Sequence, residues 1–317
     1  MSKTNRPGAP ILITMGQPAG IGPEVAVAAF TALGGRIGAT PLKFVGDPDV
    51  FKACGLNDAS AVIATAAKAN RAPGKPDAAN ARATIEAIET AVAMASRGEA
   101  AAVVTAPINK AVLMQAGFAY PGHTEFLQAL TKVPRAVMML ASDTLRVVPL
   151  TVHIPLAQVP GAISTAAIVE TGEIVLAALA RDFGIASPRL AVAGLNPHAG
   201  EDGVLGPEDG AIVAPAVAAL KAKGHDVRGP LSADTLFHEE ARARYDAALC
   251  MYHDQALIPI KTLAFWDGVN VTLGLPIVRT SPDHGTAFDI AGTGKADMRS
   301  MVAAIRMAAM MADARAR

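Results

Sequence analysis

Residues 252–294 read YHDQALIPIKTLAFWDGVNVTLGLPIVRTSPDHGTAFDIAGTG, and the rest of the chain is organised around this stretch. It holds two of the seven histidines, His253 and His284, together with four aspartates and the basic residues Lys261 and Arg279. Glycines and prolines divide it into short pieces. Buried packing segments are rarely this dense in polar groups. We therefore interpret the stretch as a binding surface rather than a packing element.

The composition is that of a compact globular protein. The chain has 317 residues, 51% hydrophobic and 18% charged, which suffices for two lobes with a substantial core and argues against extensive disorder. The net charge is zero, so neither a nucleic-acid surface nor a polybasic membrane patch is expected. Apolar runs stop short of membrane-spanning length, and the first residues, MSKTNRPGAP, lack the apolar core of a signal peptide. Because Cys54 and Cys250 read as reduced thiols, we expect a cytoplasmic location.

Short apolar runs alternate with helical patterns along the chain. Strands are predicted at residues such as 11–14 and 101–104, and helices at residues such as 83–98 and 165–184. This alternation predicts an α/β protein with a largely parallel sheet. Prolines and glycines interrupt the rhythm near residues 120–135, where we place a lobe boundary.

The second half of the chain continues the pattern. Residues 135–142 and 146–156 are expected to form neighbouring strands, and LIPI at 257–260 also reads as strand-like. A helix is predicted over residues 207–224, with Pro215 expected to kink or divide it.

The turn MGQPAGIGPE, residues 15–24, joins the first strand to the first helix. Its backbone amides are of the kind that can hold an anion at a helix start. Yet Gly16, Gly20 and Gly22 do not have the G-x-G-x-x-G spacing of a dinucleotide fold. A ligand loop and a tight strand-to-helix turn therefore both remain open.

Three histidines occupy matching positions. His153, His198 and His253 each stand at or just past the carboxyl end of an apolar run that reads as a strand. Ligands bind at this edge of open α/β sheets, and three imidazoles there suit a divalent transition metal with open coordination positions. Asp254 and Glu201 lie beside two of these histidines and are expected to orient the rings. We therefore predict a catalytic metal site.

Other polar residues stand at element boundaries. Lys261, Asn270 and Arg279 are flanked by apolar runs, which favours partly buried groups that pair with a phosphate or a carboxylate; an arginine offers a planar fork for either. Asp234, in LSADTLF, is either a helix cap or an acid near the ion.

The remaining histidines, and Thr124 beside one of them, are weaker indications of a functional site. At the start of another predicted helix, Thr124 can serve as the cap, and the neighbouring His123 is a lone loop histidine, a type that is more often solvated than functional. His225 and His238 read as surface residues.

Nine motifs occur in order from about residue 11 to the end of the chain. They are TMGQPAGIGPE, TAPINK, PGHTEFL, TVHIPL, LNPHAGE, SADTLF, YHDQALIPIK, GVNVTLGLPIVRTSPDHGTA and DIAGTG. Together they resemble the 4-hydroxythreonine-4-phosphate dehydrogenase family of pyridoxal phosphate biosynthesis. One departure is Gln17, where the family commonly has Asp, which leaves the role of that position open.

The resemblance implies a fold like that of isocitrate and isopropylmalate dehydrogenases, with two α/β/α lobes and a cleft between them. On this basis residues 1–125, with C-terminal helices at about 297–317, form the first lobe. Residues 126–296 form the second lobe, which is expected to carry the metal and substrate residues. The family further implies a homodimer whose active sites lie at the subunit interface.

The resemblance also implies roles for the candidate residues. His153 and His198 would hold zinc, magnesium or cobalt together with His253 of the neighbouring subunit. Five residues would contact substrate: His123, Thr124, Lys261, Asn270 and Arg279. NAD or NADP would bind without a Rossmann fingerprint. The glycine-rich turn at the end of the opening stretch suits this cofactor better than the ion; its candidate residues are His284, Gly292 and Gly294.

The implied reaction oxidises and decarboxylates 4-phosphooxy-L-threonine to 3-amino-2-oxopropyl phosphate and carbon dioxide. Asp234, Asp254 and Lys261 are the candidate proton carriers. One alternative is a D-threonate or D-erythronate 4-phosphate dehydrogenase of the same family. Two others are an aromatic dihydrodiol dehydrogenase and a non-catalytic protein that binds a metal or phosphate.

Overall fold

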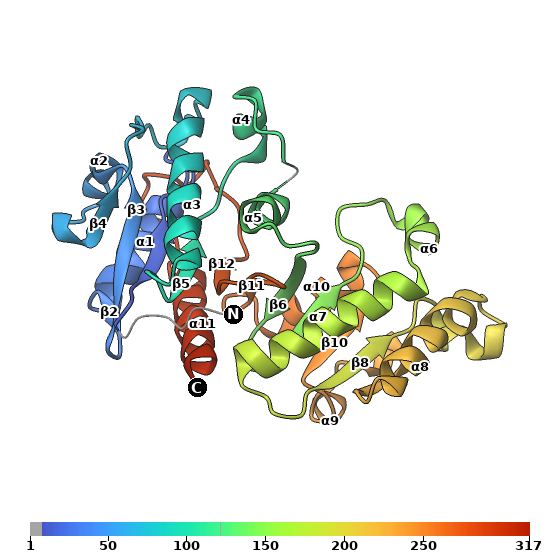
Figure 1. The fold of residues 1–317 in the computed structure, drawn as a ribbon. Helices are drawn as coiled ribbons and strands as arrows, with labels where there is room; N and C mark the ends of the chain where they lie inside the picture. The colour runs from blue at the N-terminus through green and yellow to red at the C-terminus, as the bar shows by residue number, and fades with distance from the viewer. Residues whose placement is uncertain (1–7, 121) are drawn as a thin grey trace. The chain divides into compact units, whose positions relative to one another are not determined.

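The computed structural model describes residues 8–120 and 122–317 (Figure 1). The chain folds into two compact units, one formed by residues 1–136 and 269–317 and the other by residues 137–268. This division differs from the expected boundaries at 125/126 and 296/297. Residues 269–296 belong with the first unit because β12 (Arg279–Pro282) pairs with β5 (Ala102–Thr105) of that unit.

The first unit contains a mostly parallel sheet in the order β2-β3-β1-β5-β12-β11, with β4 on β3. Only the β2–β3 and β11–β12 pairs are antiparallel. The strands not yet given are β1 (Ile11–Thr14), β2 (Arg36–Ile37), β3 (Thr40–Gly46), β4 (Val62–Ala64) and β11 (Val269–Leu273). The fully buried β1 and β5 confirm the sequence prediction for residues 11–14 and 101–104 to within one residue.

Helices cover this sheet on its faces. The α3 helix packs on β1 and β3, while α11 packs on β5 and β12 and contacts α1. In α3, buried residues recur at helical spacing (Ala83, Ala87, Ala91 and Ala95), which forms the apolar stripe predicted for residues 83–98. The helices are α1 (Gly22–Ala32), α2 (Pro48–Ala53), α3 (Ala81–Ser96), α4 (Lys110–Gln115), α5 (His123–Thr131) and α11 (Arg299–Ala316).

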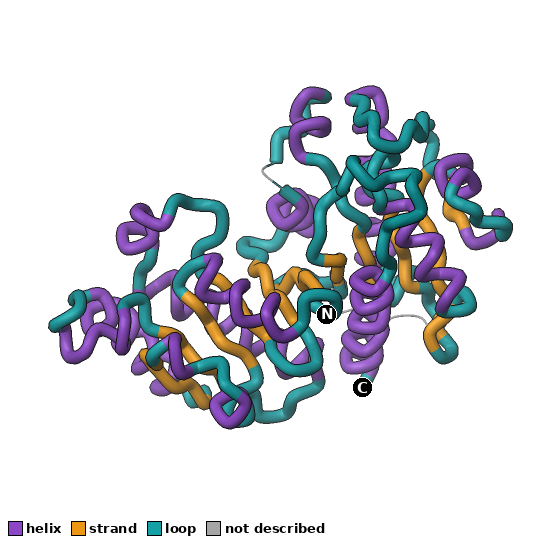
Figure 2. The backbone as a smooth tube through the Cα atoms, turned by 180° about the vertical axis from the view of Figure 1, so that it is seen from behind, coloured by secondary structure: helices purple, strands orange, loops and turns teal. Residues whose placement is uncertain are grey.

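The second unit contains a sheet in the order β6-β7-β10-β8-β9, in which only the β6–β7 pair is antiparallel. Figure 2 shows strands lying among helices in each unit. The strands are β6 (Val137–Ala141), β7 (Arg146–Pro149), β8 (Arg189–Ala193), β9 (Asp226–Leu231) and β10 (Ala247–Cys250). The helices are α6 (Val159–Ala162), α7 (Thr165–Phe183), α8 (Ala214–Ala222), α9 (Glu239–Arg242) and α10 (His253–Leu263).

Two expectations for the second half are wrong. The strand expected over residues 146–156 ends at Pro149. The LIPI segment is not strand-like but lies inside α10. Its Leu257 and Ile260 pack with Ala256 in the core beneath α10, and their spacing is that of one helix face. A short apolar run does not by itself distinguish this arrangement from a strand.

Pro215 lies just after an irregular part of its helix. A π-helical turn, Asp209–Val213, runs directly into α8, and Pro215 stands in the first turn of α8.

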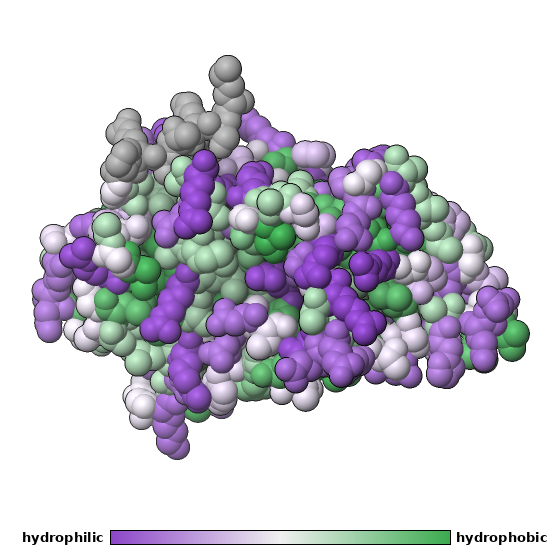
Figure 3. All heavy atoms as spheres, turned by 90° about the horizontal axis from the view of Figure 1, so that it is seen from below, coloured by the Kyte–Doolittle hydropathy of each residue, from purple (hydrophilic) through white to green (hydrophobic). Residues whose placement is uncertain are grey.

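No single helix in the described ranges is long and apolar enough to cross a membrane; one bent pair, Leu156–Ala162 with Thr165–Phe183, meets the length and composition requirement at an angle of 92°. The α7 helix of that pair packs on α8 and on β8. On the face drawn in Figure 3, hydrophilic and hydrophobic residues are interspersed.

Residues 1–7 of the amino-terminal stretch, and Pro121 near the expected lobe boundary, lie outside the described residues.

Candidate active site

A buried arginine lies at the centre of the first unit's polar cluster. Arg279 begins β12, and its side chain is enclosed between β5 and β11, with only 2% of the residue exposed. Its Nε and Nη2 donate to Thr105 Oγ1 at 3.2 and 2.5 Å. Its Nη1 donates to Thr272 Oγ1 at 2.9 Å and to Asn270 Oδ1 at 3.4 Å. In the described parts of the chain, Arg279 has no carboxylate partner, and burial lowers its pKa to about 9.

His123 lies close to this arginine. It is the first residue of α5, and Gly122 rather than Thr124 is the residue before the helix, so the expected capping role of Thr124 is wrong. The His123 side chain is half-buried, but its Nε2 is shielded from solvent and has no hydrogen-bond partner among residues 8–120 and 122–317. Burial and then the charge of Arg279 hold the pKa of His123 well below its usual range. The first unit therefore places a neutral imidazole beside a buried cation.

The three metal-candidate histidines all belong to the second unit. Each follows the carboxyl end of a strand, as predicted: His153 follows β7, His198 follows β8, and His253 opens α10 after β10. The ring centres of His153 and His253 are 6.1 Å apart. Within the described ranges, however, no three His, Cys, Asp or Glu side chains form a group that could hold a metal ion.

Acidic residues accompany these histidines. His253 Nδ1 and Asp254 Oδ1 are 2.7 Å apart, so Asp254 does orient the ring. No hydrogen bond joins Glu201 to His198 in the part of the chain that the structure describes. Instead, the acid near His198 is Asp234, whose pKa is lowered by a hydrogen bond from Ser232 Oγ and, to a smaller extent, by His198.

The loop that carries His198 has an unusual backbone. His198, Ala199, Glu201 and Asp202 all have positive φ angles between 41° and 55°. The buried carboxylate of Asp209 accepts hydrogen bonds from the backbone amides that precede this loop, Leu195 N at 2.7 Å and Asn196 N at 3.0 Å. Asp209 thus fixes the entry to the loop, a role that no local sequence signal indicated.

Lys261 and its surroundings lie on α10. A shallow cavity of about 380 Å³ is lined by side chains of this helix alone: His253, Asp254, Leu257, Ile258, Lys261 and Thr262. Lys261 is half-buried, with its Nζ 5.8 Å from the centre of the Phe265 ring. Large apolar side chains beside this cavity are exposed, and these are Ile258, Leu263, Phe265 and Trp266.

The turn at residues 16–22 is a structural turn in this chain. The backbone amides of Gln17, Gly20 and Ile21 donate to the carbonyls of Pro107, Gln17 and Thr286 at 2.9 to 3.1 Å. The side-chain oxygen of Gln17 accepts a hydrogen bond from Ala19 N. These amides are therefore already paired, which resolves the open question in favour of the tight turn and gives Gln17 a local role.

The glycine-rich turn predicted to hold the cofactor is anchored by an ion pair. Gly292 N donates to Glu24 Oε1 at 2.7 Å, and Glu24 pairs with Arg71. Arg71 also donates to the carbonyls of Pro18 and Gly20 in the neighbouring turn. A Cβ at Gly292, whose φ is +76°, would approach Pro73 to 2.8 Å, so a larger residue does not fit. The position of Glu24 at a helix start suits the helix dipole, but no local sequence signal indicated its pairing with Arg71.

His284, at the beginning of the same turn, is partly constrained. Its Nδ1 lies 3.0 Å from the Gly285 carbonyl oxygen, and its buried Nε2 has no partner in the described ranges. Gly294, like Gly292, has a positive φ.

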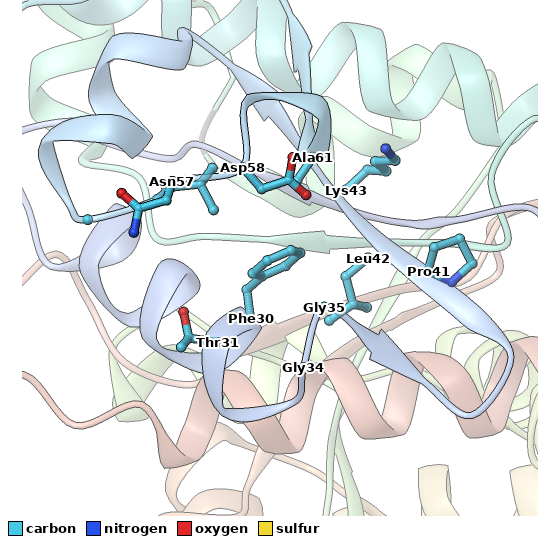
Figure 4. Close-up of a pocket in the computed structure, with 12 residues that line it drawn as sticks. Phe30, Thr31, Gly34, Gly35, Pro41, Leu42, Lys43, Asn57, Asp58 and Ala61 are labelled. Carbon is cyan, nitrogen blue, oxygen red and sulfur yellow. The ribbon is translucent and has the colours of Figure 1, made fainter.

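Another cavity, beside β3 of the first unit, lies away from these residues. It has a volume of about 510 Å³ and opens at the amino end of β3. Figure 4 shows the Phe30 ring among its lining residues, with Asn57 and Asp58 nearby. None of the candidate site residues lines this cavity.

The fold agrees with distant solved structures. A β-decarboxylating dehydrogenase from Thermococcus kodakarensis, 18% identical, superposes with a TM-score of 0.53 over 96% of this chain and 82% of that one. A terephthalate 1,2-cis-dihydrodiol dehydrogenase from Burkholderia xenovorans is 29% identical with a TM-score of 0.68, covering 95% of this chain and 98% of that one. The expected α/β fold class is confirmed.

Closer relatives share one name. The 4-hydroxythreonine-4-phosphate dehydrogenase of Roseobacter denitrificans is 55% identical over 320 residues, covering 96% of this chain and 97% of the relative. A crystal structure of the Klebsiella pneumoniae enzyme of that name is 39% identical, with a TM-score of 0.84 over 96% of this chain and 99% of that one. The family model described as pyridoxal phosphate biosynthetic protein PdxA matches residues 36–308. The chain therefore belongs to the PdxA family.

Proposed function

We propose that this protein is a 4-hydroxythreonine-4-phosphate dehydrogenase. It oxidises the hydroxyl of 4-phosphooxy-L-threonine with NAD or NADP and releases carbon dioxide, leaving 3-amino-2-oxopropyl phosphate. The observation that carries this assignment is Arg279, a buried cation without a carboxylate partner in the described residues, beside the unpartnered Nε2 of His123. Such a cation in a low-dielectric setting calls for an anionic ligand, and the proposed substrate carries both a phosphate and a carboxylate.

The substrate residues act by binding and orienting. Arg279 supplies positive charge, and Asn270, whose oxygen is occupied by Arg279, keeps its amide N–H groups for the ligand. His123 and Thr124 at the start of α5 contribute further hydrogen bonds to the same anion. Lys261, on α10, completes the set of substrate contacts.

A divalent metal ion fits the chemistry of the donor set, although the described residues of one chain do not bring three donors together. His153 and His253 lie near each other, and His198 lies near Asp234. We propose that His153 and His198 hold the ion with the partner subunit's His253. Imidazole ligands favour zinc or cobalt over magnesium. When bound, such an ion polarises the substrate hydroxyl and lowers its pKa.

We propose a homodimer formed through the surface around α10. Ile258 and Phe265 are each 63% exposed and Trp266 is 43% exposed, which is unusual for large apolar side chains beside a binding residue. Sedimentation analysis tests this directly. The wild type should sediment as a dimer, and replacing Phe265 and Trp266 by serine should yield monomer; a monomeric wild type would contradict the proposal.

The residues that we propose to transfer protons in the reaction are Asp234 and Lys261, with Asp254 in a supporting role. Asp234 lies near the metal candidate His198, and this position, rather than its lowered pKa, supports it as the group that accepts the hydroxyl proton. Asp254 holds the His253 ring. Lys261 is suited to protonate the carbon that loses carbon dioxide.

The nicotinamide cofactor accepts the hydride when it is bound. We propose that its binding segment includes His284, Gly292 and Gly294. The anchored backbone of this turn and the unpartnered Nε2 of His284 support the assignment. The two free cysteines are typical of a reducing compartment, and we place the enzyme in the cytoplasm.

The decisive experiment is an assay of NADH or NADPH formation with 4-phosphooxy-L-threonine, with and without a chelator. We expect turnover that the chelator abolishes and that added zinc or cobalt restores. Parallel assays with D-threonate 4-phosphate, D-erythronate 4-phosphate and an aromatic dihydrodiol test the related activities. Faster turnover of any of these than of 4-phosphooxy-L-threonine would reassign the substrate, and binding without reduction would indicate a non-catalytic protein.

A further inference from the structure

We infer that Thr105 and Thr272 are positioning residues that orient the Arg279 guanidinium for the substrate's anion. This inference rests on the proposed function, because it concerns the same anion site. Neither threonine belongs to the set of substrate contacts considered above, and each acts through the arginine rather than by touching the ligand.

The geometry is a clamp from two neighbouring strands. Thr105 ends β5 and Thr272 lies in β11, and these strands flank β12. Thr105 Oγ1 accepts from both Nε and Nη2, while Thr272 Oγ1 accepts from Nη1 at 2.9 Å. Because both threonines are buried, with 0% and 3% of the residue exposed, water has little access to these bonds.

The chemical type of the two acceptors matters. A carboxylate at either position would pair with the guanidinium and cancel its charge, as in an ordinary buried ion pair. A hydroxyl accepts hydrogen bonds through its dipole and leaves the full positive charge in place. The clamp therefore fixes the orientation of Arg279 while preserving its attraction for an anion.

The donors that remain point to the same conclusion. A guanidinium has five N–H groups. Four of them bond to Thr105, Thr272 and Asn270, which leaves one on Nη2. Most N–H groups of Arg279 therefore already bond within the protein, and the expected bidentate pairing with a phosphate or carboxylate is largely unavailable. The affinity of Arg279 for the substrate's anion must come from the one remaining N–H and from the positive charge. Both act in the direction that the threonines impose.

The test compares three variants. Thr105→Val keeps the shape but removes the acceptor, Thr105→Ser keeps the hydroxyl, and Thr280→Val is the matched control. Thr280, in β12, is a buried threonine like Thr105. Its hydroxyl donates to the Ala304 carbonyl and does not bond to Arg279. We expect Thr105→Val to raise the KM for 4-phosphooxy-L-threonine about tenfold or more, because the guanidinium loses both of the hydrogen bonds that Thr105 accepts. The KM for the nicotinamide cofactor should stay constant.

A second readout does not depend on turnover. Calorimetric titration with inorganic phosphate should show affinity that falls about tenfold in Thr105→Val, returns in Thr105→Ser and is unchanged in Thr280→Val. If Thr105→Val does not fold, Thr272→Val carries the same test from the opposite strand. Unchanged KM and unchanged phosphate affinity in the folded variants would overturn the inference, even if their melting temperatures fall.

The two proposals fail in different ways. A wild type that binds phosphate but does not oxidise 4-phosphooxy-L-threonine overturns the proposed function, and the phosphate titration of the variants then still decides the role of the threonines. A wild type that oxidises the substrate while Thr105→Val behaves like Thr280→Val overturns only the positioning role. A wild type that neither binds phosphate nor turns over substrate overturns both.

Discussion

The two units of this protein hold their candidate residues in opposite ways. In the first unit, Asn270 and Arg279 meet Thr105 and Thr272 through buried hydrogen bonds, with His123 close by. In the second unit, His153, His198 and His253 follow three strand ends without forming a three-donor group in the described residues. The cluster around Arg279, which we propose binds the substrate's anion, is thus already assembled in the first unit, whereas the described residues of the second unit hold no three-donor group. This difference accords with our proposal that a second subunit completes the metal centre.

The largest loss of activity is expected from a substitution in the second unit. His198→Ala should lose tightly bound metal and reduce turnover about a thousandfold or more, because a bound ion contributes several kcal/mol of transition-state stabilisation. Metal analysis of the purified protein, together with the NADH assay, measures both. His238→Ala, which changes an exposed histidine, serves as the control. Full activity with unchanged metal content in His198→Ala would remove the metal role of the three histidines.

The next largest effect is expected from the first unit. Arg279→Met removes the buried charge but fills similar space, and the KM for 4-phosphooxy-L-threonine should rise about a hundredfold. Unlike His198→Ala, this variant should keep its metal. A metal content that falls together with substrate affinity would show that the two sets of residues are coupled rather than divided between the units.

Alkaline pH should weaken substrate binding through Arg279 of the first unit. Arg279, with its pKa lowered to about 9 by burial, is charged below that pH and neutral above it. The substrate KM should therefore be flat from about pH 7 to about pH 8 and rise as pH increases through about pH 9. His123, whose pKa lies well below its usual range, stays neutral over this interval. Initial rates across the pH range, with Arg279→Met as the control that lacks the rise, provide the measurement.

The sequence predicted the parts of these sites that depend on local pattern. The histidines at strand ends and the burial of Arg279 between apolar runs both follow from the neighbouring residues. The clamp could not be predicted, because Thr105 and Arg279 are separated by 174 positions and meet only through the β5–β12 pairing. The sequence around a threonine in or at the end of an apolar strand does not indicate which side chain that threonine will contact. Similarly, His198 lowers the pKa of Asp234 although the two are far apart in the sequence, because the fold brings Asp234 near the loop that carries His198.

The smallest effect is expected at the cofactor turn. Glu24→Gln keeps an oxygen that can accept from Gly292 N but leaves Arg71 without its counterion. The Arg71 side chain is only 7% exposed, so the lost charge is not replaced by solvent. The turn at Gly292 should loosen, and the KM for NAD or NADP should rise a few fold while the KM for 4-phosphooxy-L-threonine stays constant.

A matched control exists in the second unit. Glu173→Gln also removes one carboxylate from an ion pair, with Lys223, but that pair is exposed and lies on a helix surface, where such pairs contribute little. It should leave both KM values unchanged. Equal rises in the cofactor KM and the substrate KM in Glu24→Gln would mean that the ion pair supports the first unit as a whole. A rise in the cofactor KM alone would assign the Gly292 turn to the binding of NAD or NADP. It would also show that this turn acts independently of Arg279 and its neighbours.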